Sequence, residues 1–139
     1  MILRDAPRPI GSQLLRFCIA GAAAFVVDAG IAQALVSLAG WNAYAASGLS
    51  YLAAATAAWW LNRRFTFGAS PAPAHREWAT YLVVNASGGA VNVVVRYALI
   101  GAFDAVRAWP WIGVAAGSVA GLLVNFAANK WYVFRRPGR

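Results

Sequence analysis

Four long apolar runs, with most of the charged residues at their edges, constrain this sequence more than any other feature. The runs cover about residues 14–38, 45–61, 78–103 and 111–128. A helix needs roughly 20 apolar residues to cross the hydrocarbon core of a bilayer. Charged residues make up only 12% of the chain, against about 25% in a soluble domain. The sequence therefore predicts an all-α, polytopic membrane protein with four transmembrane helices, because it offers no polar outer face for a soluble bundle.

A short polar box occurs twice, each time at the end of an apolar run. The first box is Asn62-Arg63-Arg64-Phe65-Thr66-Phe67, and the second, Asn129-Lys130-Trp131-Tyr132-Val133-Phe134, follows at an offset of 67 residues. An amide, a cation and aromatic rings suit the end of a membrane helix, where headgroups meet hydrocarbon. The same offset aligns Gly21 with Gly88. We interpret the chain as one membrane domain, residues 1–139, built from two repeats at about 14–67 and 81–134.

The distribution of the cations predicts the orientation in the membrane. The N-terminal arm, the middle loop and the C-terminus lie on one side and hold ten of the 12 cations when Arg16 and Lys130 are included, whereas the opposite side has only Arg107. The positive-inside rule places both termini and both boxes in the cytoplasm. Two spans per repeat also predict that the two halves run parallel, related by an axis along the membrane normal. A composition rich in Ala, Gly, Arg and Val favours a bacterial source, and hence the bacterial inner membrane.

Two charges fall inside the predicted spans. Asp28 lies near the middle of the first span, and Arg96 lies at about the same depth in the third, because the offset aligns Asp28 with Val95. An ionised side chain at the bilayer centre costs roughly 2.5–3.5 kcal/mol on insertion scales, so each should have a partner. An Asp28–Arg96 pair would neutralise both charges. Such a pair either locks two helices together or takes part in substrate passage.

The third and fourth predicted spans carry polar and small residues at helical spacing. Polar and small residues recur at intervals of three and four: Asn85, Gly88 or Gly89, Asn92 and Arg96. They share one face and favour a hydrated groove over simple helix packing. The fourth span has a glycine ladder that continues into two asparagines: Gly113, Gly117, Gly121, Asn125 and Asn129. Small residues at this spacing let helix backbones approach closely, within the chain or across a homodimer.

The cations beside the asparagines are the best candidates for binding a phosphate. Arg63 and Lys130 directly follow Asn62 and Asn129, and Arg16 is expected to join them in the same cytoplasmic group of cations. A guanidinium can grip a phosphate with two hydrogen bonds. The net charge of +8 is explained by topology and anionic membrane lipids rather than by nucleic acid. His75 and Cys18 are single, and no nucleotide-binding loop is present. The sequence predicts neither an enzyme nor a metal or other cofactor.

These residues resemble the GtrA-like family of small four-span membrane proteins over nearly the whole chain, from about Leu15 to Phe134. The resemblance rests on Arg16-Phe17 with Gly21, on Asp28, on the first box, and on Asn125-Phe126 leading into the second box. It implies movement of a polyprenyl-phosphate-linked monosaccharide from the cytoplasmic to the outer leaflet for polysaccharides of the cell surface. The resemblance also implies a membrane glycosyltransferase as a partner.

On this basis we expect three groups of site residues. Arg16, Arg63, Lys130, Asn62 and Asn129 would bind the phosphate headgroup, Asn85, Asn92 and Asn125 would line the sugar path, and Asp28 and Arg96 would form an intramembrane gate. Ala58 stands where the second repeat has Asn125, so the two halves are not symmetric. Two alternatives remain: a non-transporting subunit that recruits a glycosyltransferase, and a small exporter in which Asp28 binds a proton.

Overall fold

The computed structural model describes residues 9–135, which form helices joined by short links, with no strand among them. The chain divides into two compact units, Met1–Ala69 and Ser70–Arg139. The elements in chain order are α1 (Ile10–Ser37), α2 (Ala43–Leu61), the π-helical turn η1 (Asn62–Thr66), α3 (Ala74–Ala102), α4 (Asp104–Ala108), α5 (Pro110–Ala128) and the π-helical turn η2 (Asn129–Val133). Each unit contains one pair of long helices.

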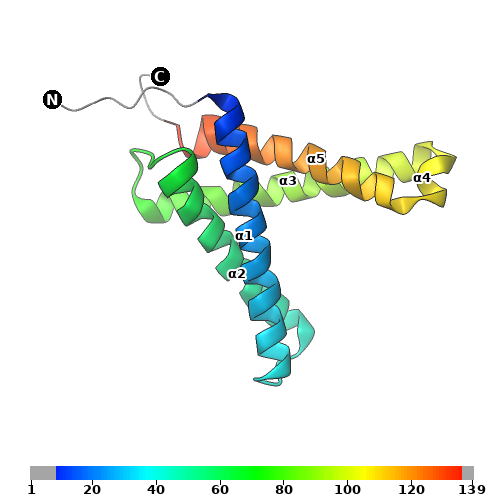
Figure 1. The fold of residues 1–139 in the computed structure, drawn as a ribbon, viewed down its shortest axis with the longest axis horizontal. Helices are drawn as coiled ribbons and strands as arrows, with labels where there is room; N and C mark the ends of the chain where they lie inside the picture. Colours follow the sequence, from blue (N-terminus) through cyan, green and yellow to red (C-terminus); the bar gives the residue numbers. More distant parts are fainter. Residues whose placement is uncertain (1–8, 136–139) are drawn as a thin grey trace. The chain divides into compact units, whose positions relative to one another are not determined.

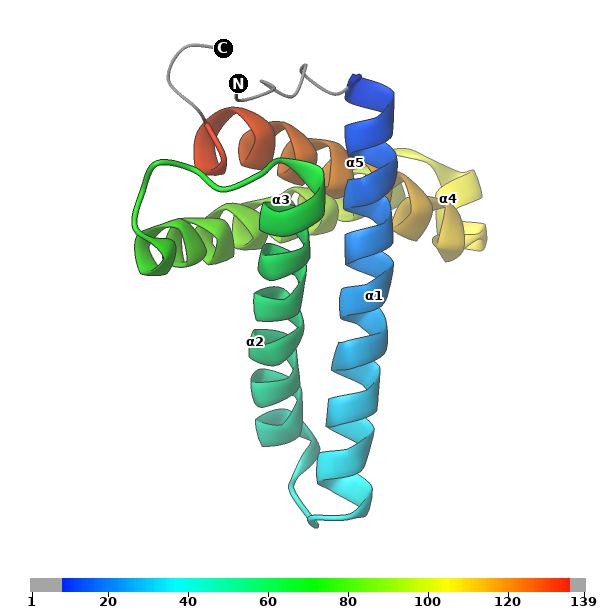
Figure 2. The same cartoon turned by 60° about the vertical axis from the view of Figure 1, so that its left-hand side comes forward.

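In unit 1, α1 and α2 form an antiparallel hairpin (Figures 1 and 2). The link turns at Gly40, whose φ of 67° is a conformation that glycine adopts without strain. The Asn42 side chain then caps α2 by accepting a hydrogen bond of 2.9 Å from the Ala45 N–H. Every fourth residue of α2 is small and buried against its neighbours: Ala46, Ser50, Ala54 and Ala58. Small side chains at this spacing let the two helices approach closely.

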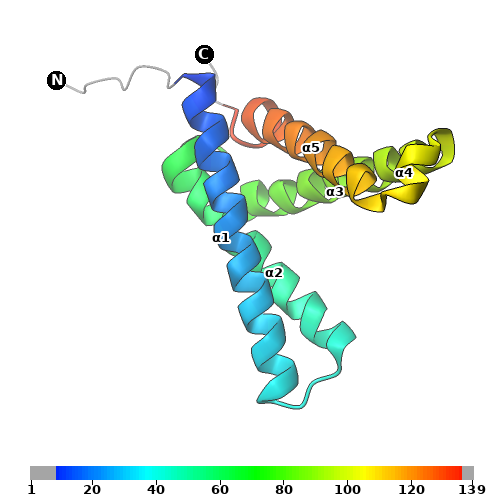
Figure 3. The same ribbon diagram turned by 45° about the vertical axis from the view of Figure 1, so that its right-hand side comes forward.

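In unit 2, α3 and α5 form the hairpin and the short α4 lies at its tip (Figure 3). The glycines of α5 meet the backbone of α3. A Cβ atom on Gly117 would lie 2.5 Å from the Asn92 carbonyl oxygen, and one on Gly121 would lie 2.7 Å from the Gly88 carbonyl oxygen. Because a backbone atom cannot swing aside, only glycine fits these positions. The glycine ladder therefore packs α5 against α3 within the chain.

Several element boundaries differ from those expected from the sequence. α3 begins at Ala74 rather than near Trp78, so His75 and Glu77 belong to the helix and not to the loop. Pro73 precedes the helix, and the Glu77 carboxylate accepts a 2.7 Å hydrogen bond from the Ser70 N–H, which ties the loop to the first turn. The loop shrinks further because η1 continues the chain in helical form to Thr66. α1 likewise begins earlier than expected, at Ile10.

Within residues 9–135, three helical segments are long and apolar enough to cross a membrane: Ile10–Ser37, Ala74–Ala102 and Ile112–Val133. α2 does not meet this criterion, since its serine, tyrosine and tryptophan residues lower its mean hydropathy. The chain is thus an all-helical membrane protein with several apolar helices, and the fourth span stays a prediction. Most of the expected N-terminal arm, with Arg4 and Arg8, and the C-terminal cations Arg136 and Arg139 lie outside the described residues.

Candidate functional site

Each hairpin ends in a π-helical turn that begins with a buried asparagine. Asn62 is 1% exposed and Asn129 is 0% exposed. The Phe67 N–H donates to the Asn62 carbonyl, and the Phe134 N–H donates to the Asn129 carbonyl, each at 2.9 Å. These two turns stand at the offset of 67 residues that relates the boxes in the sequence. π-helical turns are rare and occur frequently at functional sites.

Both turns hold a cation over an aromatic ring one turn earlier in the helix. The Arg63 Cζ atom lies 5.6 Å from the centre of the Trp59 ring, and the Lys130 Nζ atom lies 5.9 Å from that of Phe126. Lys130 also lies 5.6 Å from the centre of the Trp131 ring. Cations within about 6 Å of a ring face are attracted to it. The two turns therefore present positioned positive charges at corresponding places.

Arg16 joins the first of these turns. Its Nη1 donates to the Phe65 carbonyl oxygen at 3.1 Å, which connects α1 to η1. The neighbouring Phe17 ring packs on Phe67 with ring centres 6.0 Å apart. A guanidinium has five N–H donors, so a single backbone contact leaves others for an anion. Two of the predicted phosphate ligands thus meet at the first turn: Arg63 belongs to the turn, and Arg16 is hydrogen-bonded to it from α1.

Two further asparagines, Asn85 and Asn125, lie beside Asn129 at the second turn. The Asn129 Nδ2 donates to the Asn125 carbonyl oxygen at 2.7 Å, and it lies 3.5 Å from the Asn85 Oδ1. The Asn125 and Asn129 Oδ1 atoms are buried and have no hydrogen-bond partner among the residues that the structure describes. An unsatisfied buried acceptor costs about 1–3 kcal/mol. Within the described part of the second hairpin, these two oxygens are therefore acceptors that a donor could stabilise.

The remaining asparagine of the predicted sugar path lies further along the same interface. The Asn92 Nδ2 is 3.4 Å from the Ser118 Oγ, and Asn92 packs on Gly117. Gly88 faces the Asn125 side chain, whose Oδ1 lies 1.9 Å from where a Cβ on Gly88 would be. Asn85, Gly88 and Asn92 thus share one face of α3, as their spacing predicts, and this face meets α5. Their role as a sugar path stays a prediction.

Asp28 has a partner that sequence reasoning missed. The Ser50 Oγ donates to the Asp28 Oδ1 at 2.5 Å, and Ser50 is 0% exposed. The sequence did contain a signal, because Ala46, Ser50, Ala54 and Ala58 stand at the 67-residue offset from Gly113, Gly117, Gly121 and Asn125. Arg96 belongs to the other unit, so the Asp28–Arg96 pair stays a prediction.

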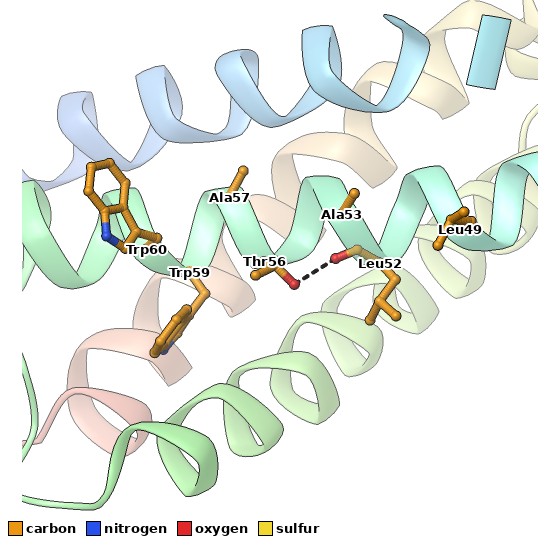
Figure 4. Close-up of a pocket in the computed structure, with 7 residues that line it drawn as sticks. All are labelled: Leu49, Leu52, Ala53, Thr56, Ala57, Trp59 and Trp60. Carbon is orange, nitrogen blue, oxygen red and sulfur yellow. Dashed lines mark hydrogen bonds between the residues drawn. The ribbon is translucent and has the colours of Figure 1, made fainter. Parts of the chain in front are cut away.

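An apolar hollow of about 560 Å³ runs along α2 (Figure 4). Its lining residues all come from this helix: Leu49, Leu52, Ala53, Thr56, Ala57, Trp59 and Trp60. The Thr56 hydroxyl donates to the Leu52 carbonyl at 2.8 Å, which satisfies it within the helix and lowers the polarity of this surface. The Trp59 ring, which lines the hollow, also contacts the Arg63 guanidinium, so a cation lies beside the hollow.

The comparison with protein families decides the identity of the chain. A family model described as GtrA/DPMS, transmembrane domain, matches residues 16–138. The chain belongs to the GtrA/DPMS transmembrane family. This membership confirms the resemblance found in the boxes and is consistent with a membrane protein that takes part in the handling of lipid-linked sugars. A search of curated proteins found no match.

This GtrA/DPMS chain has few side chains suited to metal binding. Within residues 9–135, no three His, Cys, Asp or Glu side chains gather closely enough to hold a metal ion. The positively charged turns and the asparagine cluster are therefore the features from which we argue its function.

Proposed function

We propose that this chain moves a polyprenyl-phosphate-linked monosaccharide from the cytoplasmic to the outer leaflet of the bacterial inner membrane, for the modification of cell-surface polysaccharide. One observation carries the proposal: each hairpin ends in a π-helical turn that holds a cation over an aromatic ring, Arg63 over Trp59 and Lys130 over Phe126. Family membership supports the same substrate class.

The chemistry of the substrate fits these turns. A lipid phosphate needs cations, and a guanidinium can hold it with two parallel hydrogen bonds, as Arg16 and Arg63 would at the first turn. Lys130 would act as a point charge at the second turn. The aromatic rings suit the interfacial depth at which a headgroup enters. The polyprenyl tail can stay in the bilayer, so only the headgroup needs a polar path, and the protein acts without catalysing a reaction.

We further propose four spans, arranged as two parallel repeats with both termini in the cytoplasm. α2 and α5 have 19 residues each and begin 67 residues apart, and each continues into a π-helical turn. Under the positive-inside rule, this arrangement puts both cation-bearing turns at the cytoplasmic surface, where the substrate is made.

The headgroup would then pass the asparagines of unit 2 and the charges inside the spans. In this proposal Asn85, Asn92 and Asn125 accompany the sugar, and Asp28 and Arg96 act as a gate. Arg96→Ala and Asp28→Asn should each change the rate of lipid movement while the protein folds normally. Unchanged rates in both variants would show that the gate hypothesis is wrong.

A second candidate function is a membrane subunit that positions a glycosyltransferase. The matching family model is described as a transmembrane domain, which suits a membrane module that works with other parts. Trp131 and Tyr132 are 61% and 70% exposed in the second turn and offer an aromatic contact surface. A stable complex with a transferase, without lipid movement by the chain alone or in that complex, would favour this function. A homodimer is a further proposal, since four short helices offer little interior for a headgroup.

Leaflet movement in proteoliposomes tests the primary proposal. We expect protein-dependent movement of a fluorescent polyprenyl-phosphate monosaccharide, and its loss when Arg63→Ala and Lys130→Ala are combined. Arg64→Ala is the matched control, because Arg64 is an exposed cation in the same turn. If the wild-type protein folds but gives no movement, with or without a transferase, the proposal is wrong.

A further inference from the structure

The orientation of the Asn129 amide is fixed by its own hydrogen bond. Its Nδ2 donates to the Asn125 carbonyl oxygen at 2.7 Å. Turning the amide over would place Oδ1 against that carbonyl, and two acceptors would repel each other. The Nδ2 group thus donates its hydrogen bond within the protein, and Oδ1 is the amide atom that still lacks a hydrogen-bond partner within the described residues. Among residues 9–135 this buried Oδ1 has no donor, although Asn129 is 0% exposed.

Because the Asn129 Oδ1 is an acceptor without a donor in the part of the chain that the structure describes, a ligand that binds to it must supply a hydrogen-bond donor. A phosphodiester offers only acceptor oxygens, so it cannot satisfy the Asn129 Oδ1. An ammonium group or a metal cation is disfavoured, because the positively charged Lys130 is the next residue and would repel it. A neutral hydroxyl has the required donor and carries no charge. Asn125 adds a second buried Oδ1 without a partner in the described part of the chain.

We propose, as a deepening of the function proposed above and resting on it, that the Asn125 and Asn129 amide oxygens accept hydrogen bonds from sugar hydroxyls. The second hairpin then recognises an unmodified, uncharged monosaccharide, and the phosphate is held by the cations alone. Asn129 accordingly belongs to sugar recognition rather than to phosphate binding.

The first hairpin provides a natural control for this inference. Ala58 occupies the position that corresponds to Asn125, and the first π-helical turn forms with alanine there. Asn125→Ala therefore introduces a residue that the same framework already tolerates. Asn129→Leu removes the second acceptor but also the hydrogen bond to Asn125, so Asn125→Ala is the primary variant and Asn129→Leu the supporting one.

The experiment is a binding titration in phosphatidylcholine nanodiscs. A short-chain polyprenyl phosphate is compared with the same lipid carrying a neutral hexose. The wild-type protein should bind the sugar-bearing lipid about tenfold more tightly, which corresponds to about 1.4 kcal/mol. Asn125→Ala should bring this ratio close to one without changing the Kd for the sugar-free lipid. Lys130→Ala should weaken the binding of both lipids by the same factor and leave the ratio unchanged.

The outcomes separate this inference from the proposed function. If the wild-type protein binds neither lipid, the proposed function fails. If it binds both equally, or if folded Asn125→Ala and Asn129→Leu both keep the tenfold ratio, only the sugar inference fails. Phosphatidylglycerol supplies a third arm, since its headgroup also has hydroxyls. Phosphatidylglycerol binding as tight as that of the sugar-bearing lipid, and equally weakened by Asn125→Ala, would overturn the assignment to a sugar.

Discussion

The two hairpins share a framework and differ in where they keep their polar groups. Both place small residues at every fourth position of the second helix, and both end that helix in a π-helical turn with a cation over a ring. In the first hairpin a side-chain hydrogen bond between the two helices joins Ser50 to Asp28. In the second, Gly117 occupies the corresponding place, and the polar groups gather around Asn125 and Asn129 at the end of the helix.

This difference shows that one packing scheme can carry two kinds of chemistry. The small-residue positions set the distance between the helices, and single substitutions on that stripe decide which polar group is buried. Ser50 in place of glycine gives a carboxylate its partner. Asn125 in place of alanine adds an amide beside Asn129. The cation-bearing turns are common to both hairpins, whereas Asn125 of the second hairpin is replaced by Ala58 in the first.

The largest expected effect comes from testing how closely the helices of unit 2 approach. Gly117→Ala should destabilise the protein by about 3 kcal/mol, because the new Cβ would lie 2.5 Å from a backbone oxygen. Gly48→Ala in α2 is the matched control, since nothing lies within 4 Å of a Cβ there. Unfolding in mixed micelles measures both variants. Equal stability of the two would contradict the difference in backbone approach.

The next largest effect concerns the polar contact of unit 1. Ser50→Ala should cost about 2 kcal/mol, because it leaves the Asp28 carboxylate without its hydroxyl donor. Thr56→Ala, in the same helix, should cost less, since the Thr56 hydroxyl donates to the uncharged Leu52 carbonyl of its own helix. In an Asp28→Asn background the cost of Ser50→Ala should fall by about half, because the group losing its donor is then uncharged. A double-mutant cycle without coupling would contradict the Ser50–Asp28 contact.

A smaller effect should distinguish the two turns. Arg16→Ala removes the guanidinium that donates to the Phe65 carbonyl, at a cost of about 1 kcal/mol for an exposed contact of this kind. The position that corresponds to Arg16 in the second repeat is Val83, so η2 has no such support. Hydrogen exchange at residues 62–67 should therefore quicken about fivefold, as 1 kcal/mol implies, and exchange at residues 129–134 should not change. Equal acceleration of both turns would contradict this assignment.

Much of the fold could be predicted from the sequence. The apolar runs predict the long helices, and the steps of four from Gly113 to Asn129 predict a tightly packed face, which the Gly117 and Gly121 contacts confirm. The spacing of Asn85, Gly88 and Asn92 predicts their common face. These features follow from helical periodicity, which is a local property of the sequence.

Other features depend on contacts between residues that are not related by helical spacing, so the sequence pattern does not predict them. The two boxes predict helix ends but not π-helical turns, because one extra residue per turn follows from how the turn packs and not from its composition. Glu77 is buried, and its carboxylate accepts a hydrogen bond from the Ser70 N–H across a loop, a contact between residues seven positions apart. The leftover acceptor of Asn129 depends on where its Nδ2 points, which the sequence does not encode locally. Ser50 was predictable in part. The 67-residue offset aligns it with Gly117 of the glycine ladder, but the sequence does not indicate that its hydroxyl bonds to Asp28.

The most direct test of the central claim compares the two cation-bearing turns in one transport assay. The rate of leaflet movement of a labelled polyprenyl-phosphate monosaccharide would be measured in proteoliposomes for Arg63→Ala, Lys130→Ala and the folded wild-type protein. If both turns serve the phosphate, each single variant should slow the movement about tenfold, as expected when a contact worth about 1.4 kcal/mol is lost. Rates equal to that of the wild-type protein in both variants would contradict the claim that these turns bind the headgroup.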